Sequence, residues 1–299
     1  MANLKEIRER IRSVKTTKQM TSAMKMVAAA KLGRAQKNIE RLRPYATKLQ
    51  EIMGDIAGNV SEPLESPYAE ERTQEKVMLV IITSNRGLCG AFNANVAKEG
   101  VAAANGDYQD QYAAGNLGIL AIGKKGFEFF ERREFNMVGG KNHDVFADLR
   151  FETVNAVAQS IMDAFVEGEW DRVELVYNTF KNAATQVLTR EQFLPLRGVE
   201  EHPEEAEASG VAADYIFEPD QYEILSELIP KSLRIQLYRA ILESNAGEQG
   251  ARMVAMDNAT ENAEELLKSL RLSYNKARQA AITTEILEIV AGAEALESA

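Results

Sequence analysis

The sequence is poor in the side chains that most metal- and cofactor-dependent catalysis uses. Its 299 residues include one cysteine, Cys89, and two histidines, His143 and His202. A single cysteine excludes an internal disulfide and is typical of a reducing, cytoplasmic compartment. So few cysteines and histidines disfavour a structural zinc site, which commonly takes four such ligands. Both histidines lie in polar or acidic surroundings typical of solvated loops, so we expect neither a catalytic histidine nor a zinc site.

Long apolar runs are also lacking. The longest continuous run, residues 77–82, is the size of one buried strand and far short of the ~20 residues that cross a bilayer as a helix. The first residues are densely charged and lack the apolar core of a signal peptide. We therefore expect any membrane association to occur through a partner.

The charge is unevenly distributed along the chain. Residues 1–50 carry 13 Lys and Arg against 3 Asp and Glu, although the whole chain has a net charge of −10. Such an asymmetry indicates that the N-terminal segment faces an acidic partner, either a nucleic acid or a protein surface. Basic and apolar residues interleave in this segment, and it offers no aromatic residues for base stacking. The pattern therefore disfavours a nucleic-acid partner.

Helix-breaking residues are rare at both ends of the chain, where the sequence predicts two very long helices. Residues 3–56 contain one proline, Pro44, and their apolar residues recur in alternating steps of three and four. Lys18 and Lys25 occupy positions of this seam where a coiled coil favours apolar groups. We expect Pro44 to kink the helix or mark an irregularity.

The same 3.5-residue repeat returns in residues 220–299, with Pro230 early enough to mark a bend. Neither helix can bury its apolar stripe alone. The simplest solution is mutual pairing as an antiparallel, left-handed coiled coil. A compact bundle with additional breaks is the alternative.

Residues between these helices have the pattern of an α/β domain. Apolar strands are predicted at residues 77–82, 117–122, 173–178 and 185–194, and helices at 91–104, 124–134 and 152–167. Alternating strands and helices predict a mainly parallel, Rossmann-like sheet. The expected organisation is an N-terminal helix at 1–58, a linker at 59–75, the α/β domain at 76–219, and a C-terminal helix at 220–299. The acidic segment 200–210 is expected to form a surface loop.

Two stretches resemble phosphate-binding loops. Residues 118–124 have the spacing GxxxxGK, but Lys125 stands where Ser or Thr would ligate Mg²⁺, and the residues between the glycines are apolar. We interpret this stretch as a strand that ends in a glycine turn. Residues 84–90 follow the first strand, the position of a ligand loop, but lack the GxGxxG spacing. A structural turn that displays Arg86 is the favoured interpretation.

The end of the C-terminal helix is unusual because it is apolar on nearly every face after Ile286. Helices that are apolar all round are normally buried. At this position, burial requires either a partner or docking onto the protein's own surface. The residues alone leave both possibilities open.

Several motifs resemble the gamma subunit of F-type ATP synthase. The C-terminal motif of that family, [IV]-T-x-E-x-x-[DE]-x-x-x-G-A, is matched from Ile282 to Ala293. Similar segments lie elsewhere in the same order as in the family: residues 20–31, 83–90, 251–256 and 272–279. Asn85 departs from the Asp that many members carry.

The resemblance implies a non-catalytic rotor shaft, with no catalytic residue, no metal and no cofactor of its own. Its coiled coil would turn inside a ring of three alpha and three beta subunits. The α/β domain would bind the epsilon subunit and the membrane c-ring, whose proton-driven rotation the shaft couples to the catalytic sites. It also implies one copy per complex, no homo-oligomer, no nucleic acid, and a peripheral location on the cytoplasmic face of the bacterial inner membrane.

The resemblance further implies roles for individual residues. The residues that contact the beta subunit or influence coupling would be Met24, Arg86, Arg252, Arg278, Gln279 and Thr283. A foot facing the c-ring and epsilon would include Tyr215, Phe217 and Glu218. The apolar tip that turns in a sleeve at the top of the ring would include Ile286, Ile289, Val290 and Leu296.

Overall fold

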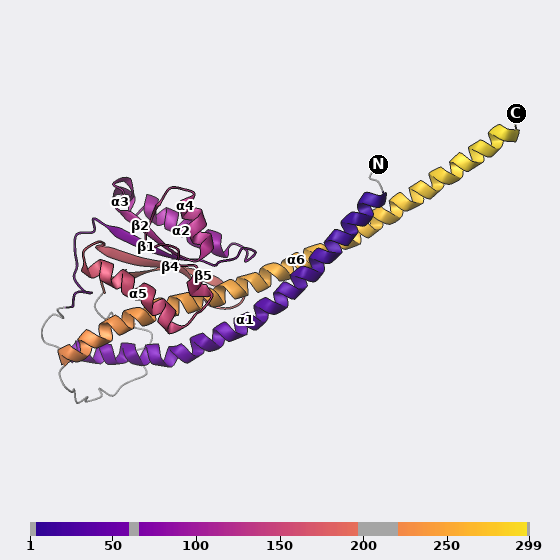
Figure 1. The fold of residues 1–299 in the computed structure, drawn as a ribbon. Coiled ribbons are helices and arrows are strands. Elements are labelled where there is room, and N and C mark those ends of the chain that lie inside the picture. Colours follow the sequence, from indigo (N-terminus) through magenta and orange to yellow (C-terminus); the bar gives the residue numbers. More distant parts are fainter. Residues whose placement is uncertain (1–3, 60–65, 197–220, 298–299) are drawn as a thin grey trace. The chain divides into compact units, whose positions relative to one another are not determined.

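The computed structural model describes residues 4–59, 66–196 and 221–297. Two long helices, α1 (Leu4–Asn59) and α6 (Gln221–Glu297), enclose the strands and shorter helices in sequence (Figure 1). The acidic segment 200–210 lies outside the described residues, as do the three predicted foot residues Tyr215, Phe217 and Glu218.

Contacts divide the chain into two units, which are described separately. The coiled-coil unit comprises residues 1–28 and 252–299, and the α/β unit comprises residues 29–251. Each long helix contributes a segment to both units. This division runs across the two helices, whereas the predicted domain boundaries follow the ends of helices and strands.

The α/β unit is built on a five-stranded sheet in the order β3-β2-β1-β4-β5. Strand β1 (Val77–Ile82) pairs in parallel with β2 (Leu117–Ile122) and with β4 (Arg172–Phe180). Strand β2 also pairs in parallel with the short β3 (Asn136–Met137), which the sequence pattern did not reveal. The mainly parallel, Rossmann-like sheet predicted from the sequence is confirmed.

The remaining strand, β5 (Gln186–Leu194), runs antiparallel to β4. A tight turn joins the two strands, in which the backbone N–H groups and carbonyls of Asn182 and Thr185 bond to each other. Such a hairpin needs no crossover helix, which explains why the last predicted strand follows its neighbour so closely in the sequence.

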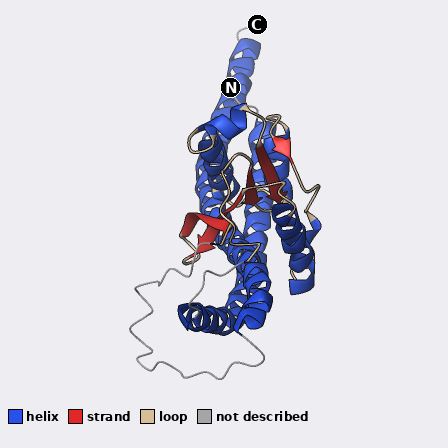
Figure 2. Ribbon diagram, turned by 90° about the vertical axis from the view of Figure 1, so that its left-hand side faces the viewer, coloured by secondary structure: helices blue, strands red, loops and turns tan. Residues whose placement is uncertain are grey.

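Helices cover both faces of this sheet (Figures 1 and 2). Three residues of β1 join a core shared with one flanking helix, with α1 and with the first part of α6. The other three residues of β1, which alternate with them, join a second core, shared with the helices on the other face. Because β1 is buried on both faces, its sequence is a continuous apolar run rather than an alternating one. The helices and the short 3-10 turn of this unit are α2 (Phe92–Asn105), α3 (Gln109–Ala113), α4 (Lys124–Glu131), η1 (Asp144–Phe146) and α5 (Phe151–Val166).

In the coiled-coil unit, α1 and α6 run antiparallel. Lys18 Nζ lies 3.0 Å from a carboxylate oxygen of Glu264, and Lys25 Nζ lies 2.5 Å from Asp257. Seven residues forward on α1 therefore correspond to seven residues backward on α6, as the predicted pairing requires. The buried positions keep the heptad spacing and include Ile7, Thr21, Ala28, Met256, Ala263 and Leu267.

Both long helices continue through their prolines. Pro44 lies inside α1 and Pro230 inside α6, and neither ends its helix. Each proline removes one intrahelical hydrogen bond, because it has no N–H. The alternative of a compact bundle with further helix breaks is wrong for the described residues, in which each segment forms one uninterrupted helix.

Candidate functional site

The polar residues of the coiled-coil seam between Lys18 and Lys25 form their contacts across the two helices of the seam. The Thr21 hydroxyl lies 2.7 Å from that of Thr260, and the lysine pairs described above flank these threonines. The hydrogen bond from Lys18 holds the pKa of Glu264 below its usual range. Lys18 and Lys25 therefore occupy seam positions because α6 supplies a carboxylate opposite each of them. The exposed basic residues of α1 in this unit include Arg10, Arg12 and Lys15.

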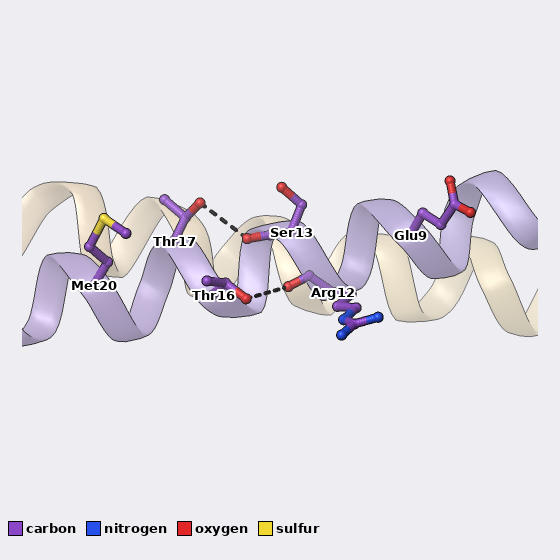
Figure 3. Close-up of a pocket in the computed structure, with 6 residues that line it drawn as sticks. All are labelled: Glu9, Arg12, Ser13, Thr16, Thr17 and Met20. Atoms are coloured by element: carbon purple, nitrogen blue, oxygen red, sulfur yellow. Dashed lines mark hydrogen bonds between the residues drawn. The ribbon is translucent and has the colours of Figure 1, made fainter.

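The exposed surface of α1 in this unit carries a shallow hollow. Figure 3 shows six residues along a shallow hollow of about 360 Å³: Glu9, Arg12, Ser13, Thr16, Thr17 and Met20. The hydroxyls of Thr16 and Thr17 donate to carbonyls of their own helix, each at 3.1 Å. Their methyl groups and the exposed Met20 thioether therefore remain available for contact.

The residues predicted to contact the beta subunit differ in exposure. Arg278, Gln279 and Thr283 are exposed on α6, where Thr283 Oγ1 donates to the Gln279 carbonyl at 2.9 Å. Met24 is half-buried, and Arg252 is only 8% exposed. The first three side chains can meet a partner directly. Arg252 is packed inside the protein and is not available on its surface.

The tip of α6 is exposed on every side. Every residue from 278 to 293 is exposed, including Ile286, Ile289 and Val290. The heptad pairing places the first described residue of α1, Leu4, opposite the start of this segment. The described part of α1 thus offers no partner for the tip. Leu296 lies within α6, but its side chain is outside the described residues.

The loop after β1, residues 83–90, is tied to the start of α4. Thr83 Oγ1 accepts a hydrogen bond from Gly126 N at 2.7 Å, and Asn85 Oδ1 accepts one from Lys124 N at 2.9 Å. Asn85 Nδ2 also donates to the His143 carbonyl at 2.8 Å. The amide uses both its acceptor and its donor, whereas an aspartate could only accept. The departure from Asp at position 85 therefore has a structural reason in this chain.

A second set of hydrogen bonds closes the same loop on itself. Asn93 Oδ1 accepts from Ser84 N at 2.9 Å, and Asn93 Nδ2 donates to Cys89 Sγ at 3.2 Å. Ser84 Oγ donates to the Arg86 carbonyl at 2.7 Å. Cys89 is buried within this network, which gives it a structural role. Arg86, predicted to be displayed by a turn, is exposed as expected, and so is Leu88.

Helix α6 fills the place where doubly wound sheets usually bind a ligand. That place lies at the carboxyl ends of the strands where the strand order reverses, here between β1 and β4. Asn178, near the end of β4, donates to the Phe92 carbonyl at 3.2 Å. A Cβ on Gly247 of α6 would lie 3.3 Å from the Phe92 ring and 3.7 Å from the Asn178 carbonyl oxygen. The glycine permits this close approach, and the helix occupies the crevice.

The GxxxxGK stretch is the strand β2 followed by a glycine turn, as predicted. Gly118 lies within β2, and Gly123 has a φ of 107°. A Cβ on Gly123 would lie 2.1 Å from the Thr83 carbonyl oxygen, so the turn packs tightly against the loop after β1. The apolar residues between the glycines are fully within the sheet and form no phosphate cradle.

A buried charged cluster was not predicted from the sequence. Glu174 of β4 is buried, and it lies 2.8 Å from Arg172 and 3.4 Å from Arg190 of β5. Burial and a hydrogen bond to Glu174 raise the pKa of Tyr108. The cluster ties the segment before α3 to the sheet. Its signal in the sequence is the spacing of Arg172 and Glu174, which places them on one face of the strand, within a segment that is apolar from Val173 to Tyr177 apart from Glu174.

Two absences apply to the described residues alone. No group of three or more His, Cys, Asp or Glu in this part of the chain could hold a metal ion. Within the same residues, no helix is both long and apolar enough to cross a membrane.

Comparisons with known proteins converge on one family. The profile of the family described as ATP synthase matches residues 3–296. The chain is 49% identical over 298 residues to the ATP synthase gamma chain of Cytophaga hutchinsonii, covering 100% of both chains. It is 52% identical over 296 residues to the ATP synthase gamma chain of Flavobacterium johnsoniae, covering 99% of each.

Two solved structures share the fold. A chain of the Euglena gracilis mitochondrial ATP synthase (OSCP/F1/c-ring) aligns with a TM-score of 0.63 at 22% identity, covering 99% of this chain and 95% of that one. A chain of the Tetrahymena thermophila mitochondrial ATP synthase central stalk and c-ring aligns with a TM-score of 0.54 at 26% identity, covering 80% of this chain and 99% of that one. These likenesses support the predicted arrangement of two long helices around an α/β sheet.

Proposed function

Because the chain belongs to the family of ATP synthase gamma chains, we propose that it is the central rotor shaft of a proton-translocating F-type ATP synthase. In this role it makes no covalent bond and binds no nucleotide. It couples rotation of the membrane c-ring to the conformational cycle of the catalytic sites and so regulates ATP hydrolysis and proton flow. Its location is peripheral, on the cytoplasmic face of the bacterial inner membrane, with one copy per complex.

The observation that carries this proposal is the exposed apolar tip of α6. Residues 278–293 lie outside the antiparallel pairing and are exposed although they include Ile286, Ile289 and Val290. Apolar surface in water costs about 25 cal/mol for each Å² that could be buried. A surrounding apolar sleeve removes that cost, and an alpha–beta ring with a central hole provides one. The small side chains near the end keep the helix narrow enough to turn.

The mechanism follows from differential contact. A shaft whose sides differ makes different contacts with each catalytic site as it turns, and each orientation stabilises a different conformation of that site. Arg278, Gln279 and Thr283 supply hydrogen-bonding groups near the tip. Arg86 and the basic side chains of α1 supply charge for acidic surfaces of the beta subunit. The α/β unit, whose ligand crevice α6 fills, binds the epsilon subunit and the c-ring.

Two measurements on purified material test the proposal. Alpha, beta and epsilon subunits should co-purify with the chain from its native membrane in a fixed stoichiometry. The isolated chain should show no stoichiometric ATP binding in equilibrium dialysis. Clear nucleotide binding by the chain alone, or its purification without the other subunits, contradicts the rotor function.

A double substitution tests the predicted contacts near the tip. In the assembled complex, Arg278→Ala with Gln279→Ala removes two hydrogen-bonding side chains, one of them charged. Because a charge-assisted hydrogen bond is worth roughly 1.5–3 kcal/mol, ATPase turnover should fall by about tenfold or more. The exposed Arg271→Ala, outside the predicted contacts, is the matched control. Unchanged turnover in the double variant removes the assignment of these residues.

A further inference from the structure

We propose that Leu88 is an apolar anchor, held outward by a braced loop, that inserts into an apolar hollow bordered by carboxylates on a partner subunit. The proposal rests on the proposed function and extends it, since it adds a residue to the contact surface and states the chemistry of the complementary surface. Four observations support it: the backbone conformation of Leu88, the exposure of its side chain, the hydrogen bonds that fix the loop, and the positive charge around it.

The backbone at Leu88 adopts a conformation that disfavours leucine. Its φ is 64°, in the left-handed region, where a Cβ approaches the carbonyl oxygen and where glycine is favoured. Gly87 precedes it, and Gly90, with a φ of 60°, follows two residues later. Among the described residues, Glu134 is the other non-glycine residue with positive φ. Glu134 follows the end of α4, where a left-handed residue commonly terminates a helix.

Packing within this chain does not offset the strain at Leu88. Its side chain is 66% exposed, so little apolar surface is removed from water. A glycine at this position would adopt the same backbone at lower cost. Strained residues persist where the surrounding structure over-determines them, and they cluster at functional sites. The exposed leucine is therefore best explained by a contact outside the described chain.

The residues around Leu88 form a rigid support. Cys89 is only 1% exposed and accepts a hydrogen bond from Asn93, so the chain enters the core directly after Leu88. Ser84 is bonded to Asn93 and to the Arg86 carbonyl. With both sides of the loop fixed, the leucine side chain remains on the surface. A pre-ordered anchor loses little conformational freedom on binding.

The surroundings of the loop are basic. Arg86 is exposed two residues before Leu88. Lys124 and Lys125 begin α4, which Asn85 joins to the loop through the Lys124 N–H, and the exposed Lys141 lies close to Phe127 of the same helix. Glu128 is the acid that pairs with both lysines of α4. This excess of positive charge complements a protein partner that places carboxylates beside an apolar hollow.

The wild-type chain and two variants, Leu88→Asn and Leu88→Met, each full length and assembled with alpha and beta subunits, test the anchor. Leu88→Asn keeps a residue that tolerates left-handed backbone but removes the apolar group. Leu88→Met keeps an apolar side chain of similar size. We expect Leu88→Asn to weaken association of the shaft with the alpha–beta assembly by about tenfold, and Leu88→Met to change it by less than about threefold. When isolated, Leu88→Met should keep the wild-type thermal midpoint, and Leu88→Asn should keep or slightly raise it, because asparagine tolerates the left-handed backbone.

The outcomes separate the two proposals. Equal affinity of Leu88→Asn and wild type overturns the anchor while the rotor function stands. Equal losses in Leu88→Asn and Leu88→Met also overturn it, because apolar character would then be irrelevant. Failure of the wild-type chain to associate with alpha and beta overturns the rotor function and the anchor together. A thermal midpoint lowered only in Leu88→Asn assigns the leucine to folding and overturns the contact.

Photo-crosslinking identifies the complementary surface. A photoreactive leucine analogue at position 88 of the assembled complex should form adducts with apolar residues of another subunit, within a few positions of Asp or Glu. Adducts confined to this chain contradict the proposal, as do adducts on a subunit surface without nearby carboxylates. Arg86→Ala should reduce the salt dependence of association, because it removes one cation beside the anchor.

Discussion

The two ends of helix α6 are both rich in apolar residues, yet their environments are opposite. In the α/β unit, Leu233, Leu237 and Ile241 of α6 are completely buried in the core beneath the sheet. In the coiled-coil unit, Ile286 and Ile289 are more than half exposed. Helical periodicity alone cannot distinguish the two ends. The comparison teaches that an apolar helix surface indicates a need for burial, but does not indicate whether the same chain or a partner covers it.

The same contrast applies to the glycines of α6. In the α/β unit, a Cβ on Gly250 would lie 3.0 Å from the carbonyl oxygen of Ala183, in the β4–β5 turn. At the tip, a Cβ on Gly292 would meet nothing within 4 Å. The first glycine serves close packing within this chain. At the second, a side chain would extend into open space among the described residues, so no packing within this chain requires the glycine.

The largest expected difference in the free energy of unfolding is between two aspartate substitutions, one at each end of α6. Leu237→Asp buries an unpaired carboxylate and should lower the free energy of unfolding by ~4 kcal/mol or more. Ile289→Asp, at a side chain that is 68% exposed, should change it by less than ~0.5 kcal/mol. Urea denaturation followed by circular dichroism measures both. Similar losses for the two variants would mean that the tip is buried within the chain.

Alanine at the two glycines should give effects of opposite sign. Alanine favours a helix over glycine by ~1 kcal/mol, so Gly292→Ala should stabilise the helical tip. In Gly250→Ala the same gain is outweighed by overpacking against the backbone of Ala183, and we expect a net loss of ~1 kcal/mol. Helix content and thermal midpoint report the first change, and denaturant unfolding reports the second. Stabilisation by Gly250→Ala would show that the β4–β5 turn around Ala183 can move to make room for the added methyl group.

The smallest expected effect concerns two carboxyls of α6 whose pKa values shift in opposite directions. Burial raises the pKa of Glu243 above its ordinary 4.5, with Glu191 adding to the shift and Arg239 opposing it. The folded state therefore holds this proton more tightly than the unfolded state, and stability is lost as pH rises through the raised pKa. Glu243→Gln should increase stability near pH 7 relative to wild type, and the difference should shrink below pH 4.5.

The hydrogen bond from Lys18 lowers the pKa of Glu264, so its contribution has the opposite sign. Stability from this group is present above the ordinary pKa of 4.5 and is lost as pH falls through the lowered value. Glu264→Gln should slightly reduce stability near pH 7 and have no effect in strong acid. Urea titrations of both variants between pH 3 and pH 8 provide the measurement. Parallel pH profiles would contradict the two assigned environments.

Much of the fold was predictable because its signals are local and periodic. The apolar run of β1 and the seam of α1 each extend over enough residues to identify the element and its partner face. Short elements such as β3 and α3 left no such signal, since two or five residues carry no period. The cluster around Glu174 was missed because its members come from separate elements and meet only after the sheet forms.

The sequence by itself determined the two long helices, their antiparallel pairing, the parallel strands and the family, because these depend on periodicity, chain order and motifs. Only the tertiary structure decided how individual side chains are used. It showed that Lys18 and Lys25 pair across the seam, that Asn85 joins the loop after β1 to α4, and that α6 closes the crevice of the sheet. It also distinguished the buried end of α6 from its exposed tip. The physical reason is that burial and hydrogen bonding depend on segments far apart in the chain, whereas period and composition are properties of one segment.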